Sequence, residues 1–259
     1  MYANTIEKCS TNAVRIVALN KTSPFSFMVS SAMAGAYIGL AIILVFTLGD
    51  PLSPPLRPLV MGATFGLALT LVIIAGSELF TGHTMFLTFG VKTGAIHWKD
   101  SIRILPKTWI YNLLGSIAVA GLFYLSGGGE LLVNSESLIH HVALTKTTSP
   151  ITVLFFKGIL CNWLVCLAIW MCQRTEGTGK FIAIWWCLLA FISCGYEHSI
   201  ANMSLFALSY FGEHQTGFTL FGIVRNLFWV SLGNLLSGVI FMGLGYWYAT
   251  PKAERPIVK

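Results

Sequence analysis

The sequence predicts an all-α membrane protein with six transmembrane helices in an inverted repeat of three plus three. The chain of 259 residues is 55% hydrophobic and only 10% charged, and its mean hydropathy is +0.74. Six of its apolar runs are long enough to cross a hydrocarbon layer about 30 Å thick. Its two halves also share sequence motifs. These observations leave no segment for a soluble domain.

The apolar runs define a transmembrane domain over residues 25–249, followed by a polar tail over 250–259. Connectors rich in Gly, Pro and Ser, such as "GDPLSPPLRP" and "SGGGE", separate several of the runs. In chain order, the six predicted spans cover residues 25–48, 59–91, 105–125, 151–172, 181–211 and 220–248.

Residues 1–24 lack the compact apolar region and the cleavage site of a signal peptide. Their apolar side chains fall near helical spacing, with basic residues between them, which predicts an amphipathic helix on the membrane surface. A frayed polar tail fits the same residues equally well. The apolar positions are Ile6, Cys9, Ala13, Ile16 and Val17.

The distribution of basic residues predicts the orientation of the chain. If the N-terminus is inside, twelve of the 16 Lys and Arg residues lie in inner segments, as the positive-inside rule requires. Both termini are therefore expected in the cytoplasm. The net charge of +6 then reflects this topology, and no basic-aromatic motif indicates a nucleic-acid partner.

The halves of the chain match in two places. "RILPKTWIYNLLGS" resembles "RNLFWVSLGNLLSG", which pairs Asn112 with Asn234, and "GSELFTG" resembles "GYEHSIA", which pairs Glu78 with Glu197. Because each half contributes three spans, the second half enters the membrane from the opposite side. The repeat is therefore inverted, an arrangement that places a solute site near mid-depth.

The second and fifth spans carry the matched G-x-E motifs and are too long for single crossings at 1.5 Å per residue. Glycines and polar residues interrupt both spans near the middle, which predicts that each helix breaks and restarts. Broken backbone is tolerated at membrane depth only where protein or a water-filled cavity satisfies it. We therefore expect both breaks to face a pathway.

Three polar residues near the breaks are candidates for contact with a solute. His198 can respond to a passing weak acid or its anion, because burial disfavours the charged imidazole and an anion favours it. Lys157 would attract an anion from a vestibule, and Asn162 could hydrogen-bond His198 or the solute. Each residue also has a purely structural interpretation, as a packed histidine, a snorkelling lysine or a bridge between helices.

Glu197 and Glu78 each precede a restarting helix, where a carboxylate can accept backbone N–H groups. We interpret both as structural, with a proton relay as the alternative. Large apolar side chains flank the breaks and could form a dry constriction, although core packing is the default for such residues. They are Phe65, Leu69, Leu79, Phe80 and Phe191.

The chain carries no recognisable enzyme signature. H-E-x-x-H, G-x-S-x-G and phosphate-loop motifs are missing from the sequence, and the histidines and six cysteines lack metal-ligand spacing, so no cofactor is expected. An intramembrane hydrolase that uses Ser199 or Ser204 with a histidine is the enzymatic alternative. A transporter of neutral solutes is a further alternative, which Lys157 argues against.

From end to end the sequence resembles the formate/nitrite transporter family. The resemblance rests on "SSAMAGAYIGL", "GSELFTGHTM", "FFKGILCNWLVCLA" and "GYEHSIANM", and "AIWWCLLAF" is typical of the nitrite branch. It implies an aquaporin-like fold, a homopentamer in the bacterial inner membrane and one pore in each protomer. The implied substrates are small monovalent anions, most of all nitrite, with formate and hydrosulfide as alternatives.

The resemblance also implies roles for individual residues. His198 corresponds to the central histidine, Thr81 and Asn162 to its hydrogen-bond neighbours, and Lys157 to the vestibule lysine. The five apolar side chains named above correspond to the constrictions, and the N-terminal helix to an element implicated in pH-dependent closing. Protonation near His198 would let a neutral acid cross the dry gap, where desolvation disfavours charge most strongly.

Overall fold

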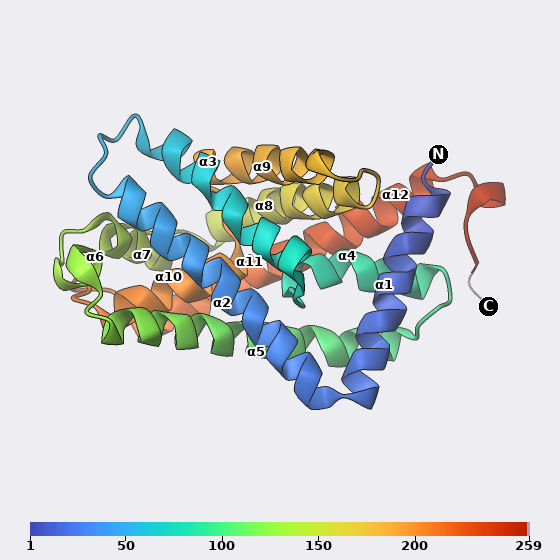
Figure 1. Ribbon diagram of the computed structural model, residues 1–259, viewed down its shortest axis with the longest axis horizontal. Helices are drawn as coiled ribbons and strands as arrows, with labels where there is room; N and C mark the ends of the chain where they lie inside the picture. Colours follow the sequence, from blue (N-terminus) through green and yellow to red (C-terminus); the bar gives the residue numbers. More distant parts are fainter. Residues whose placement is uncertain (258–259) are drawn as a thin grey trace.

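A computed structural model describes residues 1–257 of the chain, and its regular secondary structure is entirely helical within that range (Figure 1). Positions 258–259 of the predicted tail lie outside the described residues. The α-helices are α1 (Ala3–Thr22), α2 (Pro24–Gly49), α3 (Arg57–Thr70), α4 (Phe80–Lys92), α5 (Trp98–Leu125), α6 (Gly129–Val133), α7 (Leu138–Thr148), α8 (Ile151–Cys172), α9 (Thr178–Ser193), α10 (Ser199–Phe211), α11 (Leu220–Leu236) and α12 (Gly245–Ala249). Wider or tighter helical turns occupy η1 (Leu71–Gly76), η2 (Ser237–Leu244) and η3 (Lys252–Glu254).

Five helical segments of the described chain are long and apolar enough to cross a membrane, which confirms the predicted all-helical membrane class. The structure divides the predicted span 181–211 into two shorter apolar helices, α9 and α10. The five long segments are Pro24–Gly49, Arg57–Gly76, Trp98–Leu125, Ile151–Cys172 and Leu220–Ala249.

Both predicted interruptions are present as breaks in helical structure. In the range 59–91, α3 runs through η1 to Gly76, residues 77–79 are not helical, and α4 restarts at Phe80. In the range 181–211, α9 ends at Ser193 and α10 begins at Ser199. Four shorter helices therefore stand where the sequence has two long apolar runs.

Small residues allow two pairs of long helices to pack closely. At the crossing of α2 and α5, a Cβ added to Gly35 would overlap the carbonyl of Asn112, and one added to Gly115 would overlap that of Ala32. At the crossing of α8 and α11, a Cβ added to Gly233 would overlap the carbonyl of Phe155. Such contacts stabilise helix pairs that have no hydrophobic driving force in lipid.

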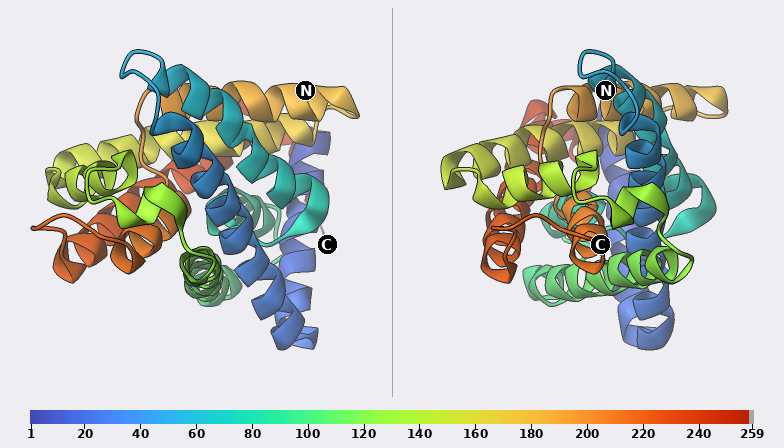
Figure 2. Two further views of the ribbon diagram at one scale, coloured as in Figure 1. Left: turned by 60° about the vertical axis from the view of Figure 1, so that its left-hand side comes forward. Right: turned by 90° about the vertical axis from the view of Figure 1, so that its left-hand side faces the viewer.

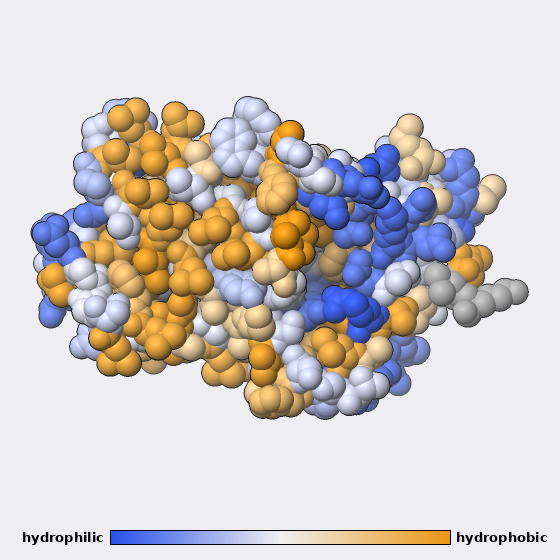
Figure 3. Space-filling view, in the orientation of Figure 1, coloured by the Kyte–Doolittle hydropathy of each residue, from blue (hydrophilic) through white to orange (hydrophobic). Residues whose placement is uncertain are grey.

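Helix α1 crosses the end of the bundle at which both termini lie (Figures 1 and 2). It packs against α4, and its side chains Ile6, Cys9, Ala13 and Ile16 are completely buried. The apolar face of α1, which the sequence predicts to lie on the membrane surface, is therefore covered by protein. Figure 3 shows hydrophilic residues gathered toward this end and apolar residues over much of the rest of the visible face.

Replacing Gly115 with Leu is expected to destabilise the protein, because the new side chain would force α2 and α5 apart. Overpacking of this kind costs about 3 kcal/mol, which should lower the thermal midpoint in detergent by several degrees. Gly121→Ala on the same helix is the control, since a Cβ there meets only a Phe211 ring carbon, at 3.9 Å. Equal midpoints for the two variants would contradict the close crossing.

Candidate functional site

Glycines at the two helix breaks turn the chain. Gly76 has φ 87° and Gly195 has φ 65°, a left-handed conformation that glycine adopts without steric cost. After each glycine, the next glutamate donates its backbone N–H to a neighbouring helix. The Glu78 N–H donates to the Ser30 carbonyl at 3.2 Å, and the Glu197 N–H donates to that of Lys157 at 3.3 Å. The breaks are thereby joined to α2 and α8.

Asn112, in the first half of the repeat, supports the first break. Its side-chain oxygen accepts the Phe80 N–H at the start of α4, at 3.0 Å. Its amide nitrogen donates to the carbonyls of Glu78 at 2.9 Å and Ser31 at 2.7 Å. One side chain thus satisfies both a donor and an acceptor that the break removes from the helical ladder.

Asn234, the repeat partner of Asn112, does the same for the second break. Its side-chain oxygen accepts the Ser199 N–H at the start of α10, at 2.9 Å. Its amide nitrogen donates to the carbonyls of Glu197 at 3.0 Å and Gly158 at 2.7 Å. The repeated sequence motifs pair these two asparagines, and the structure shows that they make equivalent contacts.

His198 occupies the last position before α10, and its side chain is held in one orientation. Nδ1 accepts the backbone N–H of Ala201 at 3.1 Å, so the neutral ring carries its hydrogen on Nε2. Nε2 lies 3.2 Å from the hydroxyl of Thr81. The Phe191 ring stacks on the imidazole with centroids 6.0 Å apart. His198 is 4% exposed.

Three cavities follow one another past this histidine. We call the first the Lys146 cavity; it has a volume of about 360 Å³, and His198 and Phe191 lie in its wall. We call the second the neck; it holds only about 10 Å³, and its wall includes His198, Phe191 and Leu79. The third, the Glu78 cavity, has a volume of about 300 Å³ and shares Leu79 with the neck. The shared residues place the cavities in series.

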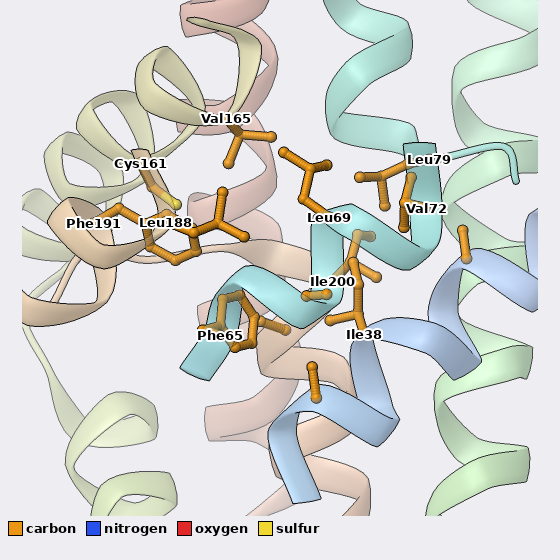
Figure 4. Close-up of a cluster of buried hydrophobic side chains, with 14 of the residues drawn as sticks. Ile38, Phe65, Leu69, Val72, Leu79, Cys161, Val165, Leu188, Phe191 and Ile200 are labelled. Carbon is orange, nitrogen blue, oxygen red and sulfur yellow. The ribbon is translucent and has the colours of Figure 1, made fainter. Parts of the chain in front are cut away.

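Apolar side chains from four helices, α2, α3, α8 and α9, and from the first break meet at the neck (Figure 4). Four of the five predicted constriction residues line it, namely Phe65, Leu69, Leu79 and Phe191. Phe80 does not; it lines an apolar groove formed by α5, α10 and α11. The remaining apolar residues of the neck were not predicted, because an apolar side chain in a membrane helix has no distinguishing local signal. These are Ile38, Ala68, Val165 and Leu188.

Glu197 forms a buried ion pair that the sequence analysis missed. Lys146 Nζ lies 2.7 Å from Glu197 Oε1, and the Asn202 amide donates to Glu197 Oε2 at 2.6 Å. Lys146 belongs to α7, outside the predicted spans, and lines the cavity that bears its name, as does Arg57. Only the fold shows that α7 returns to this cavity.

Lys157 and Asn162, both predicted site residues, lie on α8. Lys157 is half-buried, and its Nζ points toward Gly195 of the second break, 3.9 Å from where a Cβ would stand. Asn162 donates to the carbonyl of Asn234 at 2.6 Å and to the Thr84 hydroxyl at 3.2 Å. Asn162 also approaches the backbone carbonyl of Thr81 at 3.4 Å, so it adjoins the partner of His198 rather than the imidazole.

Glu78 forms a second ion-pair network, in the wall of the Glu78 cavity. Arg15 of α1 lies 2.6 Å from Glu78 Oε1, and His83 Nε2 lies 2.7 Å from Oε2. His83 Nδ1 is 3.1 Å from the Thr108 hydroxyl. Both predicted glutamates are thus buried and paired with a cation rather than exposed to lipid.

The contacts of the serines argue against a hydrolytic site. In the described part of the chain, the buried hydroxyls of Ser199 and Ser204 have no hydrogen-bond partner. Both nitrogens of His198 are engaged elsewhere, Nδ1 by the Ala201 N–H and Nε2 by the Thr81 hydroxyl. Residues 1–257 also contain no group of three or more His, Cys, Asp or Glu side chains that could hold a metal ion.

The broken helices, the cavities in series and the narrow apolar neck define a membrane protein of the channel or transporter class. The chain belongs to the formate/nitrite transporter family, whose model matches residues 3–248. This membership places it among transporters and not enzymes.

Curated relatives agree with the family assignment. The nitrite transporter NirC of Salmonella typhimurium is 69% identical over 256 residues, covering 99% of this chain and 95% of the relative. NirC of Escherichia coli K12 is 68% identical and covers 99% and 96%. The formate channel FocA of Haemophilus influenzae is 32% identical and covers 88% and 87%.

Two solved structures have the same fold. One, described as an FNT family ion channel, is 69% identical with a TM-score of 0.94, covering 95% of this chain and 99% of its own. The other, a pentameric formate channel with formate bound, is 27% identical with a TM-score of 0.72, covering 88% and 98%.

Replacing Lys146 with Met should lower the free energy of unfolding by about 3 kcal/mol, because it leaves the buried Glu197 carboxylate without a counter-charge. Adding Glu197→Gln to this variant should restore much of the loss, since no uncompensated charge then remains. Chemical denaturation of both variants in detergent measures the difference. If the double variant is as unstable as the single one, Lys146 does not act through Glu197.

Proposed function

We propose that the chain transports nitrite through a channel-like pathway formed by the Lys146 cavity, the neck and the Glu78 cavity. One observation carries this proposal: His198 stands at the edge of a narrow apolar neck that separates two cavities, each lined by a cation. The curated relatives with 68–69% identity are named nitrite transporters, which supports nitrite as the solute.

Desolvation is the main barrier to an anion in such a pathway. Moving a charge into an apolar medium costs far more than moving the neutral form of the same group. Lys146, Arg57 and Lys157 would raise the local concentration of the anion before the neck. Next to the neck, nitrite would gain a proton either from water or from a His198 that carries protons on both nitrogens and afterwards recovers its proton from the Lys146 cavity. Nitrous acid would then cross and release the proton beyond Leu79.

Thr81 and Asn162 would hold His198 in position for this step. The Thr81 hydroxyl fixes Nε2 of His198 at 3.2 Å, and Asn162 holds the Thr81 backbone from α8. Phe65, Leu69, Leu79 and Phe191 would exclude hydrated ions from the neck. In this scheme Glu197 holds Lys146 in place and takes no part in proton transfer. Phe80 lies outside the pathway, in the groove formed by α5, α10 and α11.

The proposed architecture is an aquaporin-like inverted repeat with six spans, in which α3 with α4, and α9 with α10, form the broken second and fifth spans. The equivalent contacts of Asn112 and Asn234 support it. We place both termini in the cytoplasm of a bacterium and the protein in its inner membrane, so that the Glu78 cavity opens inward. Domain boundaries follow at 1–24, 25–249 and 250–259. A homopentamer surrounded by membrane lipids is proposed from the pentameric structural relative.

Formate and hydrosulfide are the alternative substrates. Both are small anions of weak acids, and the same cavities and neck would accept them; relatives named formate channels are 31–32% identical to this chain. Transport of each anion into liposomes that contain only this protein, with and without a pH gradient, ranks the three substrates. Transport of a neutral solute alone would contradict the proposed anion pathway.

Replacing His198 with Ala should reduce nitrite flux about ten- to hundredfold, because a hydrogen bond to a charged group contributes about 1.5–3 kcal/mol. The loss should depend on pH, since nitrite has to gain a proton before it crosses the apolar neck. Stopped-flow measurement of nitrite uptake by proteoliposomes tests this prediction. Thr81→Ser, which keeps the hydroxyl, is the matched control. Unchanged flux at every pH would count against the role of His198.

Replacing Lys157 with Met should weaken uptake mainly at low nitrite concentration, by about threefold, because a nearby cation raises the local concentration of the anion. At saturating nitrite the variant and the parent protein should transport equally. Concentration-dependent flux measured at low ionic strength separates the two regimes. A uniform loss at all concentrations would assign Lys157 a structural role in the second break.

A further inference from the structure

Two basic side chains from distant parts of the chain meet beside the same pair of aromatic rings. Lys92 is the last residue of α4, and Arg255 directly follows η3. Lys92 Nζ lies 5.6 Å from the ring centroid of Trp247 and 5.4 Å from that of Tyr248. The guanidinium of Arg255 lies 5.3 and 5.4 Å from the same two centroids. We call the two basic residues the Lys92–Arg255 pair.

No carboxylate neutralises this pair within the part of the chain that the structure describes. The ion pairs found there involve neither residue. Arg255 Nε donates to the backbone carbonyl of Thr250 at 3.0 Å, and the adjacent Glu254 binds the amino group of Met1 at 3.1 Å instead. Both basic side chains are half-buried, so their repulsion is screened less than between exposed charges. An anion held by both would offset this repulsion.

The neighbouring residues place the Lys92–Arg255 pair at the level of lipid headgroups. The apolar segment Leu220–Ala249, which is long enough to cross a membrane, ends directly after Tyr248. Trp and Tyr favour the interface between membrane and water, and Tyr248 is 63% exposed. Further into the same segment, the side chains of Ile240 and Phe241 are also exposed. An acyl chain can lie against them while its headgroup stays beside the two cations.

We propose that the Lys92–Arg255 pair binds the headgroup phosphate of an anionic phospholipid. A guanidinium and an ammonium both donate charge-assisted hydrogen bonds to phosphate oxygens. Basic residues beside the end of a transmembrane helix attract anionic lipids. The inference goes beyond the proposed function, because it concerns a contact with the membrane and holds whichever solute is transported.

Each cation taken alone has a structural explanation, but their convergence does not. Lys92 complements the carbonyl end of the α4 dipole, as a basic residue does in the last turn of a helix. A single cation can also lie over a single ring for stability, as Lys99 does over Trp98 at 5.9 Å. Neither effect requires a second cation at the same rings. Binding of a shared anion accounts for both charges.

The test measures how strongly an anionic lipid protects the detergent-solubilised protein against heat. Phosphatidylglycerol is titrated into the parent protein and into the double variant Lys92→Gln with Arg255→Gln. The rise of the thermal midpoint with lipid concentration gives an apparent Kd for each protein. The double variant should bind about thirtyfold more weakly, because both headgroup contacts are lost. Lys92→Gln alone should bind about fivefold more weakly. Zwitterionic phosphatidylcholine should shift all midpoints equally.

Lys99→Gln with Lys252→Gln is the matched control, because it removes two exposed positive charges from the first turn of α5 and from η3. This variant should bind phosphatidylglycerol as the parent protein does. Exchanging the two residues, as Lys92→Arg with Arg255→Lys, keeps both charges and should preserve most of the affinity.

Equal affinity of the parent protein and the Lys92→Gln, Arg255→Gln variant would overturn the proposal, as would an equal loss in the matched control. Inorganic phosphate is titrated separately. If it protects the parent protein as strongly as phosphatidylglycerol does, the pair binds a soluble anion and the lipid assignment is wrong. Because none of these measurements involves transport, their failure is distinct from a failure of the proposed nitrite pathway.

Discussion

The structure depends on satisfying the backbone of two helix breaks in the interior of a membrane protein. An unpaired N–H or carbonyl in hydrocarbon costs several kcal/mol, so an interrupted helix survives there only if other groups replace its lost hydrogen bonds. Asn112 and Asn234 supply three such bonds each, to the restarting helix, to the glutamate before it and to a neighbouring helix. The breaks in turn place Leu79 and His198 at the neck.

The surroundings of the neck combine low polarity with nearby charge. Glu78 and Glu197 are buried, and each is paired with a cation from a helix outside the broken spans, Arg15 or Lys146. Pairing keeps these carboxylates from leaving a net negative charge beside an anion pathway. Between the two networks the wall is almost entirely apolar, with His198 as its titratable member among the residues that line the neck.

The repeat creates equivalent frameworks, and differences between equivalent positions distinguish the two sides. Leu79 and His198 both directly follow the glutamate of their break, yet one is apolar and the other can carry a proton. A symmetric backbone therefore holds an asymmetric set of side chains, and direction-dependent behaviour can arise from single residues without a change of fold.

Much of the site was accessible from the sequence because its residues are chemically unusual where they stand. A histidine, a glycine or a glutamate in a hydrocarbon run is conspicuous, which is why both breaks and His198 were predicted. Residues that are ordinary in their local sequence were missed. In the sequence, Lys146 looks like an ordinary loop lysine, and only the position of α7 brings it to Glu197. Phe80 was predicted to line the constriction, but α4 directs its side chain into the apolar groove formed with α5, α10 and α11.

The sequence by itself determined the membrane class, the approximate spans, the positions of both breaks and the family. These follow from hydropathy and repeated motifs, which are local properties of the chain. Only the tertiary structure decided which cation neutralises each glutamate, which apolar side chains close the neck, and that α1 lies against α4. Those contacts join residues far apart in the chain, and helical periodicity states which face a residue occupies but not what covers it.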